Sequence, residues 1–449
     1  MAVVPECIDE HAHEWFVQLS RDTSPLHVDA AHARRGPVGD RVVHGAHIVL
    51  ASLEVLAREG LRGWGQVAAS FRNPLTIGQP FRVEWAGPGD GLHFAARAIG
   101  GEVVLADLSL RHGTREWWRS AGVDSIDTHL AEMVAPGDAW GAAGREPLAI
   151  DATLLAQRAP GVPPGLAAAL CAASRVAGMR CPGRLALLRG FDLAPGAAGD
   201  EVAWSTTRVR DALRLIIVGL SGAVDGSVEV AMRHAPVEQP TLTQLASVVA
   251  PGEFRGMRAV VLGGTRGLGL LAARALTAGG AHVVATGRVG GDTIDDIPCE
   301  RFDIADADPA AVERLRAFSP THLLHFATPP IPRRLGRGWS DEVYDAYARV
   351  YEGGLALAAA IADGPLDVLY PSTVFIDDRP TGFDEYIAAK EASERAAADL
   401  AVGPDAISVM VERLPVLATD QTAGATSAAP EDNIDIIVPL LRAFAGRRT

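Results

Sequence analysis

A tyrosine and a lysine four residues apart, late in the chain, are of the types that exchange protons with a bound carbonyl compound. Tyr386 and Lys390 lie in EYIAAKEASERA, and on a helix this spacing places both on one face. A lysine cation beside a phenol lowers the pKa of the phenol, so that the tyrosine can donate and accept a proton near neutral pH. Thr373, with Ser372 beside it, ends the apolar run LDVLYPST and could hydrogen-bond the carbonyl oxygen. The same spacing is common on solvated helix faces, so the surrounding elements decide the interpretation.

A glycine-rich turn stands between an apolar run and a helical pattern well before this pair. Its residues are, in order, Gly263, Gly264, Thr265, Arg266, Gly267, Leu268 and Gly269. Glycine is needed where the backbone turns sharply off a strand, approaches a pyrophosphate and lets the helix pack closely on the sheet. Free N–H groups at the helix N-terminus, together with the helix dipole, then favour phosphate. The turn therefore predicts a dinucleotide-binding site.

Two arginines favour NADP(H) over NAD at that site. An NAD site usually has an acidic residue at the end of the second strand, where it holds the ribose 2′-hydroxyl. This chain has Arg288 there, after HVVATG, and Arg266 lies in the glycine turn. Two guanidinium groups suit a 2′-phosphate. We therefore expect NADPH as the cofactor.

An aspartate and a histidine stand five residues apart near the start of the chain. Asp22 and His27 lie in RDTSPLHVD, and VVHG, which ends at Gly45, precedes a helical pattern. A carboxylate and an imidazole held together in an apolar groove can supply a base and an acid. The helix that begins near Gly45 could present a backbone N–H to an oxygen on which negative charge develops. A histidine near an aspartate is also often structural.

The elements around the glycine turn alternate between strand and helix patterns. The apolar runs RAVVLGG, HVVATG, THLLHFA and LDVLYPS are separated by helical patterns, which include LGLLAARALTAGG and residues 309–317. Alternation at this spacing is typical of an α/β fold of the Rossmann type, with a doubly wound parallel sheet. We expect this NADP(H)-binding domain over residues 256–449.

The front half has a different order, in which one helix precedes several strands. Residues 44–58 read as a helix, and strand-like segments separated by Gly/Pro/Asp turns follow it. Residues 121–240 repeat this order more faintly, which suggests duplication. We expect a multidomain chain with two α+β domains, 1–120 and 121–240, each an antiparallel sheet wrapped on a central helix. A linker is expected at 241–255.

Composition narrows the class of protein. The net charge of -14 disfavours nucleic acid and anionic membrane as partners, and 48% hydrophobic with 21% charged residues is typical of a soluble globular protein. No apolar stretch approaches a membrane span, and the first residues do not resemble a signal peptide. We expect a cytoplasmic protein without a metal site or disulfides, because the four cysteines form no CxxC pair: Cys7, Cys171, Cys181 and Cys299.

The third block resembles the short-chain dehydrogenase/reductase family from the glycine turn to Pro415. The resemblance rests on that turn, on Asp303 after the second strand unit, on the YxxxK of Tyr386 and Lys390, and on the Arg-Leu-Pro that ends at Pro415, all in the family's order. It implies that Asp303 contacts the adenine and that Pro415 lies near the nicotinamide. Lys390 would contact the cofactor as well as assist Tyr386.

Three positions depart from that family. Thr373 replaces the catalytic serine, and a threonine can still supply the hydroxyl. His325-Phe326-Ala327 stands for the Asn-Ala-Gly segment, so that Ala327 is the matched cofactor-binding position. Tyr351 stands where the family has the helix asparagine that relays protons.

The first block resembles the hotdog-fold (R)-specific enoyl-CoA hydratases, the MaoC-like dehydratases, over about residues 10–115. The resemblance rests on Asp22, His27 and the His-Gly that ends at Gly45, and on FRNP and GQP further along. It implies that the Asp/His pair hydrates a 2-enoyl thioester or dehydrates a 3-hydroxyacyl thioester. The family's helix serine is replaced by Leu53, with Ser52 one residue away.

The second block resembles a degenerate hotdog repeat. It has no Asp-x4-His and no His-Gly helix start. In related double-hotdog proteins one half keeps the catalytic residues and the other helps to shape an acyl tunnel. A purely structural partner that covers the sheet edge of the first half is the alternative.

The two predicted reactions are consecutive. Reduction of a 3-oxoacyl thioester gives the 3-hydroxyacyl thioester, which loses water to give the 2-enoyl thioester. We therefore predict a bifunctional ketoreductase/dehydratase of fatty-acid, polyketide or secondary metabolism, which acts on a CoA or acyl carrier protein thioester and forms a homodimer. Arg34, Arg35 and Arg41 are candidate contacts for phosphate or an acidic carrier. The alternatives are a reductase of a sugar nucleotide or other non-thioester, and a hotdog part that serves only binding or dimerisation.

Overall fold

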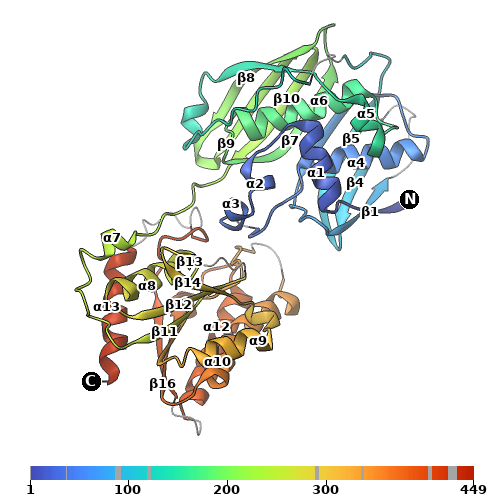
Figure 1. Cartoon of the computed structure of the whole chain (residues 1–449). Coiled ribbons are helices and arrows are strands. Elements are labelled where there is room, and N and C mark those ends of the chain that lie inside the picture. The colour runs from blue at the N-terminus through green and yellow to red at the C-terminus, as the bar shows by residue number, and fades with distance from the viewer. Residues whose placement is uncertain are drawn as a thin grey trace. The chain divides into compact units, whose positions relative to one another are not determined.

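The chain divides into two compact units, Met1–Ala235 and Pro236–Thr449 (Figure 1). The computed structural model describes residues 2–36, 38–85, 93–118, 123–288, 293–334, 338–402, 407–422 and 432–448. Among these residues no helix has the length and apolar character that a membrane span requires. Each unit has its own hydrophobic core.

The first unit is built on one ten-stranded antiparallel sheet. Its first half has the strand order β1-β3-β4-β5-β2, and the strands are β1 (Ala2–Cys7), β2 (Trp64–Phe71), β3 (Pro80–Trp85), β4 (His93–Gly100) and β5 (Val103–His112). Its second half has the order β6-β8-β9-β10-β7, and the strands are β6 (Ala143–Pro147), β7 (Ala186–Pro195), β8 (Glu201–Arg210), β9 (Leu215–Gly222) and β10 (Val224–Met232). The two orders are the same once the second half is renumbered from its own first strand.

The two halves meet where β2 pairs with β7, with Val67 opposite Leu193. Residues 1–120 and 121–240 therefore form two halves of one sheet and share one core, rather than two separate domains. The repeated helix-then-strands order is observed in both halves.

Each half carries a buried helix against the sheet (Figure 1). In the first half α4 (Gly45–Arg58) is apolar on nearly every side, which is typical of a helix enclosed by a core. In the second half α6 (Pro164–Arg175) is equally buried and continues as a π-helical turn, η2 (Val176–Arg180). α4 and α6 pack on one another. The smaller elements of this unit are α1 (Glu10–Ser20), α2 (Pro25–Val28), α3 (Ala30–Arg34), η1 (Pro136–Ala139), α5 (Ala152–Arg158) and η3 (Asp211–Leu213).

The second unit is a parallel sheet with the order β13-β14-β12-β11-β15-β16-β17. Its strands are β11 (Arg258–Leu262), β12 (His282–Gly287), β13 (Thr293–Ile294), β14 (Ile297–Arg301), β15 (His322–His325), β16 (Leu366–Thr373) and β17 (Ile407–Leu414), of which only the short β13 pairs antiparallel. Without β13 the order is 3-2-1-4-5-6, which is that of a Rossmann sheet. The predicted doubly wound α/β fold is confirmed.

Helices cover both faces of this sheet (Figure 1). One core holds α7 (Leu242–Leu245), α8 (Gly267–Ala278) and α13 (Asn433–Ala445). The other holds α9 (Pro309–Ala317), α10 (Asp341–Ile361) and α12 (Asp384–Ala401), and the short elements are η4 (Ile304–Asp306), α11 (Phe375–Asp378) and η5 (Gly446–Arg448). The strand order reverses between β11 and β15, and ligands of such sheets bind at the carboxyl ends of the strands next to this point.

The segment 241–255, for which we expected a linker, is structured. It contains α7, and Leu245, Val249 and Phe254 are buried in the core of the second unit. The linker prediction was wrong. It relied on the Pro and Gly residues, which are typical of a domain boundary, whereas the three apolar side chains pack in the core between the sheet and its helices.

Candidate active sites

The glycine turn follows β11 directly. Its glycines lie where the backbone turns, where it is open to a ligand and where the helix packs closely on the strand. Gly263 has φ of +73°, and a Cβ there would lie 2.7 Å from the Cα of Ala327 after β15. A Cβ on Gly269 would collide with the carbonyl oxygen of Gly263, so the helix could not pack on the strand. Gly267 has φ of +56° and opens on free space within 4 Å of its Cβ position. The backbone at Gly267 is therefore open to a ligand.

The N-terminus of α8 faces the same carboxyl edge. Arg266 is its N-cap residue, and the first N–H groups of a helix have no partner within it. Thr265 packs against Gly287 at the end of β12, and Leu268 is partly buried beside it in the first turn. This arrangement fits the pyrophosphate of a dinucleotide.

The other predicted cofactor residues follow neighbouring strands at this edge. Arg288 is exposed after β12, and the Asp303 carboxylate accepts the N–H of Ala305 to cap η4 after β14. Pro415 is partly buried directly after β17. The parallel sheet thus brings together residues that are up to 152 positions apart in the sequence.

Tyr386 and Thr373 meet at the carboxyl end of β16. Both are buried, Tyr386 on the first turn of α12 and Thr373 as the last residue of β16. Burial raises the pKa of Tyr386 to about 12, and a hydrogen bond with the Thr373 hydroxyl opposes this increase. Ser372 is also buried and lies beside Glu394, whose pKa is held below its usual range first by Arg413 and in smaller part by Ser372.

Lys390 occupies the expected helix face, but its ammonium group does not serve Tyr386 as we expected. Its Nζ donates to the carbonyl oxygen of Pro371 at 2.9 Å and to the hydroxyl of Tyr370 at 3.3 Å. Burial lowers the pKa of Lys390 to about 7, and the charge of Glu394 opposes this. The expected decrease in the pKa of Tyr386 is therefore wrong, because the Lys390 side chain extends toward β16 instead.

Tyrosine rings surround this lysine. Its Nζ lies 4.1 Å from the ring centre of Tyr351 and 4.6 Å from that of Tyr370. The Tyr370 hydroxyl lies 2.6 Å from Ser393 Oγ, which donates to the Ala389 carbonyl, so Tyr370 must donate to Ser393 and accept from Lys390. The amine is held by rings and oxygen acceptors in a buried site.

Tyr351 stands where the resemblance to the reductase family implies a proton-relay asparagine, and it lies beside Lys390. Its hydroxyl bonds to Thr328 at 2.7 Å, and its ring fills the space beside Lys390. His325, at the position that the family fills with asparagine, donates from Nε2 to the carbonyls of α10, and burial lowers its pKa to about 4.

A simple count could have singled out Lys390. It is the only lysine in the 449 residues, and every other basic position is arginine or histidine. Arginine is effectively never deprotonated, whereas a buried lysine shifts its pKa readily. Lys390 is therefore the one side-chain amine of the sequence whose pKa burial can bring near neutral.

In the first unit the predicted aspartate is buried in a network that includes the second half. The backbone turns at Arg21, with φ of +58°, and places Asp22 inside the unit at 1% exposure. One carboxylate oxygen accepts from Ser174 Oγ at 2.6 Å and the other from the Ser24 backbone N–H at 3.0 Å. A Cβ on Gly178 would lie 2.9 Å from both carboxylate oxygens. The end of α6 and its π-helical turn therefore enclose Asp22.

His27 has a defined tautomer. Its Nδ1 lies 2.7 Å from the carbonyl oxygen of Val42, and since a carbonyl only accepts, Nδ1 carries the proton. Burial lowers the pKa of His27, the charge of Asp22 raises it, and Arg233 lowers it further. The neutral ring therefore offers an unprotonated Nε2.

Three more histidines lie in the same region of the unit as His27. His44 stacks on it with ring centres 3.7 Å apart, His13 stacks on His44 at 5.4 Å, and His47 stacks on Phe16 at 4.6 Å. Burial is the main cause that lowers the pKa of each. We call His13, His27, His44 and His47 the histidine cluster. Among the described residues no group of side chains is arranged to hold a metal ion, so the cluster is a stack rather than a ligand set.

Gly45 opens α4, as predicted. A Cβ there would lie 2.8 Å from the ring of Phe71, so only glycine lets the helix start at this depth. The N–H groups of the first turn lack partners within the helix. Leu53, at the expected serine position, is buried in the core, and Ser52 donates to the Ile48 carbonyl of its own helix.

A serine of the second half donates to Asp22. Ser174 lies on α6, 152 residues from Asp22 in the sequence. No local pattern marked it, because the contact exists only when α6 packs beside the Asp22 loop. The buried helix of the second half does not begin with His-Gly as α4 does. α6 begins at Pro164, and a Cβ on Gly165 would collide with the backbone of Trp117.

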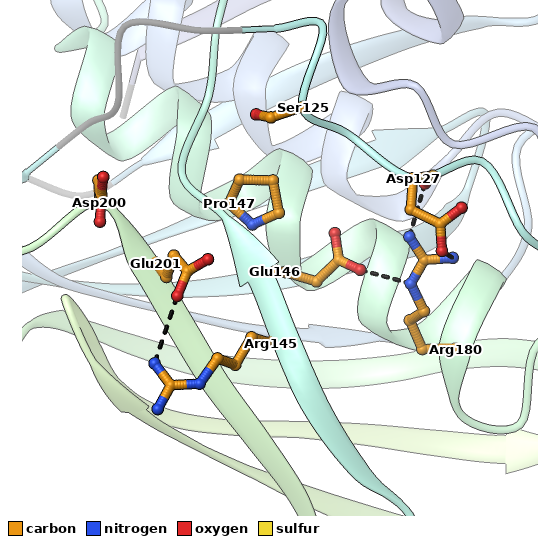
Figure 2. A pocket seen from close by; sticks show the side chains of 8 residues that line it. All are labelled: Ser125, Asp127, Arg145, Glu146, Pro147, Arg180, Asp200 and Glu201. Atoms are coloured by element: carbon orange, nitrogen blue, oxygen red, sulfur yellow. Dashed lines mark hydrogen bonds and ion pairs between the residues drawn. The ribbon is translucent and has the colours of Figure 1, made fainter.

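Arg175 holds the backbone just before Asp22. Its fully buried guanidinium donates to Glu146 at 2.8 Å, to the Ser20 carbonyl at 2.7 Å and to the Pro147 carbonyl at 2.8 Å. Glu146 also pairs with Arg180, and this pair lines a cavity of about 490 Å³ that contains further paired charges (Figure 2). The cavity residues form ion pairs with one another (Arg145 with Glu201, and Arg180 with Asp127), and Glu146 joins the cavity to Arg175.

No protein-family model and no curated protein matches this chain. Among solved structures it is similar to a putative short chain dehydrogenase from Pseudomonas syringae, with 20% identity, coverage of 44% of this chain and 93% of that one, and a TM-score of 0.38. A short chain dehydrogenase from Burkholderia cenocepacia in complex with NADP is 23% identical over 42% of this chain and 90% of its own, with a TM-score of 0.36. A 3-ketoacyl-(acyl-carrier-protein) reductase from Brucella melitensis complexed with NADH is 18% identical over 42% and 91%, with a TM-score of 0.37. At these values the similarity carries no argument about function, which has to come from the geometry of the two sites.

Proposed function

We propose that the second unit is an NADP(H)-dependent ketoreductase of the short-chain dehydrogenase/reductase kind. The observation that carries this proposal is the meeting of the Tyr386 and Thr373 hydroxyls at the carboxyl edge of a Rossmann sheet, beside an open glycine turn. A phenol and a second hydroxyl at that place suit a carbonyl oxygen that takes up a proton. The single lysine of the chain lies one helical turn away.

The cofactor would be held by the residues that border the sheet edge. Gly267 and the first turn of α8 would face the pyrophosphate, Arg266 and Arg288 the 2′-phosphate, Asp303 the adenine, and Ala327 and Pro415 the nicotinamide end. Bound NADPH would supply a hydride to the carbonyl carbon.

The chain's own residues favour reduction. Because burial raises the pKa of Tyr386 to about 12, this phenol is protonated at neutral pH and can give its proton to the oxygen of the substrate carbonyl. Thr373 would hold the same oxygen. Lys390, with a pKa of about 7, can accept or release a proton at the pH where the enzyme works.

We further propose that the first unit is a hotdog-fold hydratase/dehydratase of thioesters. In dehydration the unprotonated Nε2 of His27 takes the proton α to the thioester and then gives it to the leaving β-hydroxyl. A C–H and a C–O bond break, a C=C bond forms and one water is released. The negative charge of Asp22 stabilises the imidazolium between these steps, in line with its effect on the pKa of His27. Gly45 would donate its backbone N–H to the thioester oxygen.

The two chemistries together indicate the substrate. The product of ketone reduction, a 3-hydroxyacyl thioester, is the substrate of the dehydration. A bifunctional enzyme of a biosynthetic pathway that extends acyl chains, with a CoA or carrier-protein thioester as its partner and a homodimeric state, remains our proposal.

A coupled assay tests it. Wild-type protein is given a 3-oxoacyl thioester and NADPH, and cofactor oxidation and enoyl absorbance are followed together. We expect both signals in the wild type, loss of only the enoyl signal in Asp22→Asn and His27→Ala, and loss of both in Tyr386→Phe. NADPH oxidation with a sugar or simple ketone but never with a thioester, and no hydration of a crotonyl thioester, would establish instead a non-thioester reductase with an idle hotdog unit.

A further inference from the structure

The amine of Lys390 is held by acceptors on two consecutive residues of β16. Its Nζ donates to the carbonyl oxygen of Pro371 at 2.9 Å and to the hydroxyl oxygen of Tyr370 at 3.3 Å. The Pro371 acceptor belongs to the backbone, so a substitution would not remove it. Among the described residues Tyr370 is the only side chain that accepts a hydrogen bond from this amine. Tyr370 is therefore the side chain through which a substitution can change how the amine is held.

Ser393 fixes the direction of the hydrogen bonds at Tyr370. Ser393 Oγ donates to the carbonyl oxygen of Ala389 at 2.7 Å, so its oxygen accepts the proton of the Tyr370 hydroxyl at 2.6 Å. The Tyr370 oxygen then has a lone pair for Lys390 and no proton to give it. The donors run from Lys390 to Tyr370 to Ser393 and end on a backbone carbonyl. Because it ends there, this chain of hydrogen bonds can hold the amine but cannot carry its proton away.

The hydroxyl pair is sealed from solvent. Tyr370 and Ser393 are both fully buried, so water does not compete for the Tyr370 oxygen. Ser393 follows Lys390 by three residues on α12, which places the serine and the lysine on one face of the helix. A phenylalanine at position 370 would fill the same space, but it would offer Lys390 no oxygen.

Other ionisable groups around the amine contribute less to holding it. The charge of Glu394 favours the ammonium, but this carboxylate is paired with Arg413. His325 on β15 is neutral at ordinary pH because burial lowers its pKa to about 4. Tyr351 offers the face of its ring, and burial raises its pKa, so it is neutral as well. Three further ionisable side chains belong to the elements packed here, namely Tyr386, Glu352 and Asp377.

The charge of Lys390 matters for the proposed reduction. When Tyr386 gives its proton to the carbonyl oxygen, the phenol O–H bond breaks and a phenolate remains. The ammonium of Lys390, one helical turn away, can return a proton to this phenolate. An N–H bond then breaks, the O–H bond of Tyr386 forms again, and a proton from solvent restores the ammonium. Reduction therefore requires the protonated amine, which burial disfavours.

We propose that Tyr370 is a positioning residue for ketone reduction: its hydroxyl, oriented by Ser393, holds the amine of Lys390 beside β16 in its protonated form. This inference rests on the proposed function of the second unit and adds the residue that sets the pH range of the reaction. An acceptor stabilises the ammonium more than the neutral amine. Loss of the Tyr370 oxygen should therefore lower the pKa of Lys390.

The single lysine of the chain allows a direct test without substrate. Protein labelled with lysine that carries ¹³C at Cε gives one side-chain signal, whose chemical shift is followed as a function of pH. We expect a midpoint at a pH of about 7 in the wild type. In Tyr370→Phe the midpoint should lie about one pH unit lower, because a hydrogen bond from a charged donor is lost. The control Tyr344→Phe removes a hydroxyl from a ring that stacks on Trp339, and it should keep the wild-type midpoint.

The pH dependence of ketone reduction should move with this midpoint. With saturating 3-oxoacyl thioester and NADPH, kcat falls as the pH rises through the pKa of Lys390, because the ammonium is lost. In Tyr370→Phe this fall should be centred about one pH unit lower, which makes kcat at pH 7 about 5-fold smaller than in the wild type. Ser393→Ala leaves the Tyr370 oxygen in place but removes the acceptor that orients it, so it should give a smaller shift in the same direction.

Three results would overturn the inference: an unchanged lysine midpoint in Tyr370→Phe, an equal change in Tyr344→Phe, or a lowered midpoint that leaves the pH profile of kcat unmoved. If Tyr370→Phe does not fold, Ser393→Ala is put to the same two measurements. If no ketone is reduced, the proposed function fails on its own. The lysine signal then still decides whether Tyr370 holds the amine, because it requires neither substrate nor cofactor.

Discussion

At the scale of the residue, the pKa values of Tyr386 and Lys390 are set by the surroundings of the phenol oxygen and of the amine nitrogen, and not by their spacing in the sequence. Tyr386 and Lys390 share a face of α12, yet the phenol meets Thr373 while the amine reaches Tyr370 and Pro371. Burial raises the pKa of the first and lowers that of the second, which keeps both neutral forms accessible at ordinary pH. Functional sites commonly hold groups in states that cost stability.

Replacement of the single lysine should stabilise the protein and stop ketone reduction. A folded pKa of about 7, against 10.5 for an ordinary lysine, means that the unfolded chain binds the extra proton between these values. The stability of the wild type therefore increases from pH 7 to pH 10, and the burial of Lys390 destabilises the fold by an amount on the order of a few kcal/mol at and below pH 7. Lys390→Met removes this cost.

We expect Lys390→Met to have a higher Tm than wild type at pH 7 and a flatter dependence of Tm on pH up to 9. NADPH oxidation should fall by at least about 100-fold, because in the proposed mechanism this amine accepts and releases a proton near the working pH. A lower Tm at pH 7 would mean that the amine is a structural element and not a strained functional group.

At the scale of the element, α6 with its π-helical turn carries the residues that complete the first site. Ser174 donates to Asp22, Arg175 holds the Ser20 carbonyl, and Gly178 leaves room for the carboxylate. π-helical turns are found often at functional sites, since the extra residue redirects side chains. The second half is thus part of the site, although it has no Asp/His pair.

Loss of the Ser174 hydroxyl should impair hydration more than stability. Ser174→Ala removes a charge-assisted hydrogen bond to a buried carboxylate, and we expect about a 10-fold lower kcat/KM with a crotonyl thioester. Ser52→Ala is the matched control, because this buried serine donates to its own helix and not to Asp22. Equal losses of activity in the two variants would contradict a positioning role for Ser174.

At the scale of the whole molecule, the two units differ in chemistry as well as in fold. Seven of the eight tryptophans lie in the first unit and all five tyrosines in the second. The histidine cluster belongs to the first unit, where three of its members are buried and His27 is half-buried, and loss of solvation lowers the pKa of all four. Tryptophan fluorescence therefore reports mainly on the unit that holds the cluster.

Acid should unfold the first unit. The folded pKa of each cluster histidine lies below the value of 6.5 that it has in an unfolded chain, so the unfolded state binds more protons below that pH. Stability is then complete above pH 6.5 and is lost as the pH falls below it. We expect the urea midpoint from tryptophan fluorescence to decrease from pH 7.5 to pH 5, and His47→Phe, which keeps the stack on Phe16, to decrease less. A midpoint unchanged over this range would refute the assignment.

Local patterns were sufficient to predict much of this protein. Alternating apolar runs and helices predicted the parallel sheet, and the glycine turn, Tyr386, Thr373, Asp22, His27 and Gly45 were singled out from their spacing together with the family resemblances that they carry. These features are determined by neighbours in the chain: a 3.6-residue period, a positive φ that only glycine adopts without strain, and a helix start. The only lysine could have been added by counting.

The tertiary structure decided the rest, because it depends on contacts between distant segments and on flexible side chains. The pairing of β2 with β7 joined two expected domains into one sheet and brought Ser174 to Asp22. The several rotatable bonds of Lys390 let it turn from Tyr386 to Tyr370, and burial, which no local spacing reveals, set the pKa of both residues. Arg233 is an ordinary arginine in the sequence, and only the fold buries much of it and brings its Nη2 to His32.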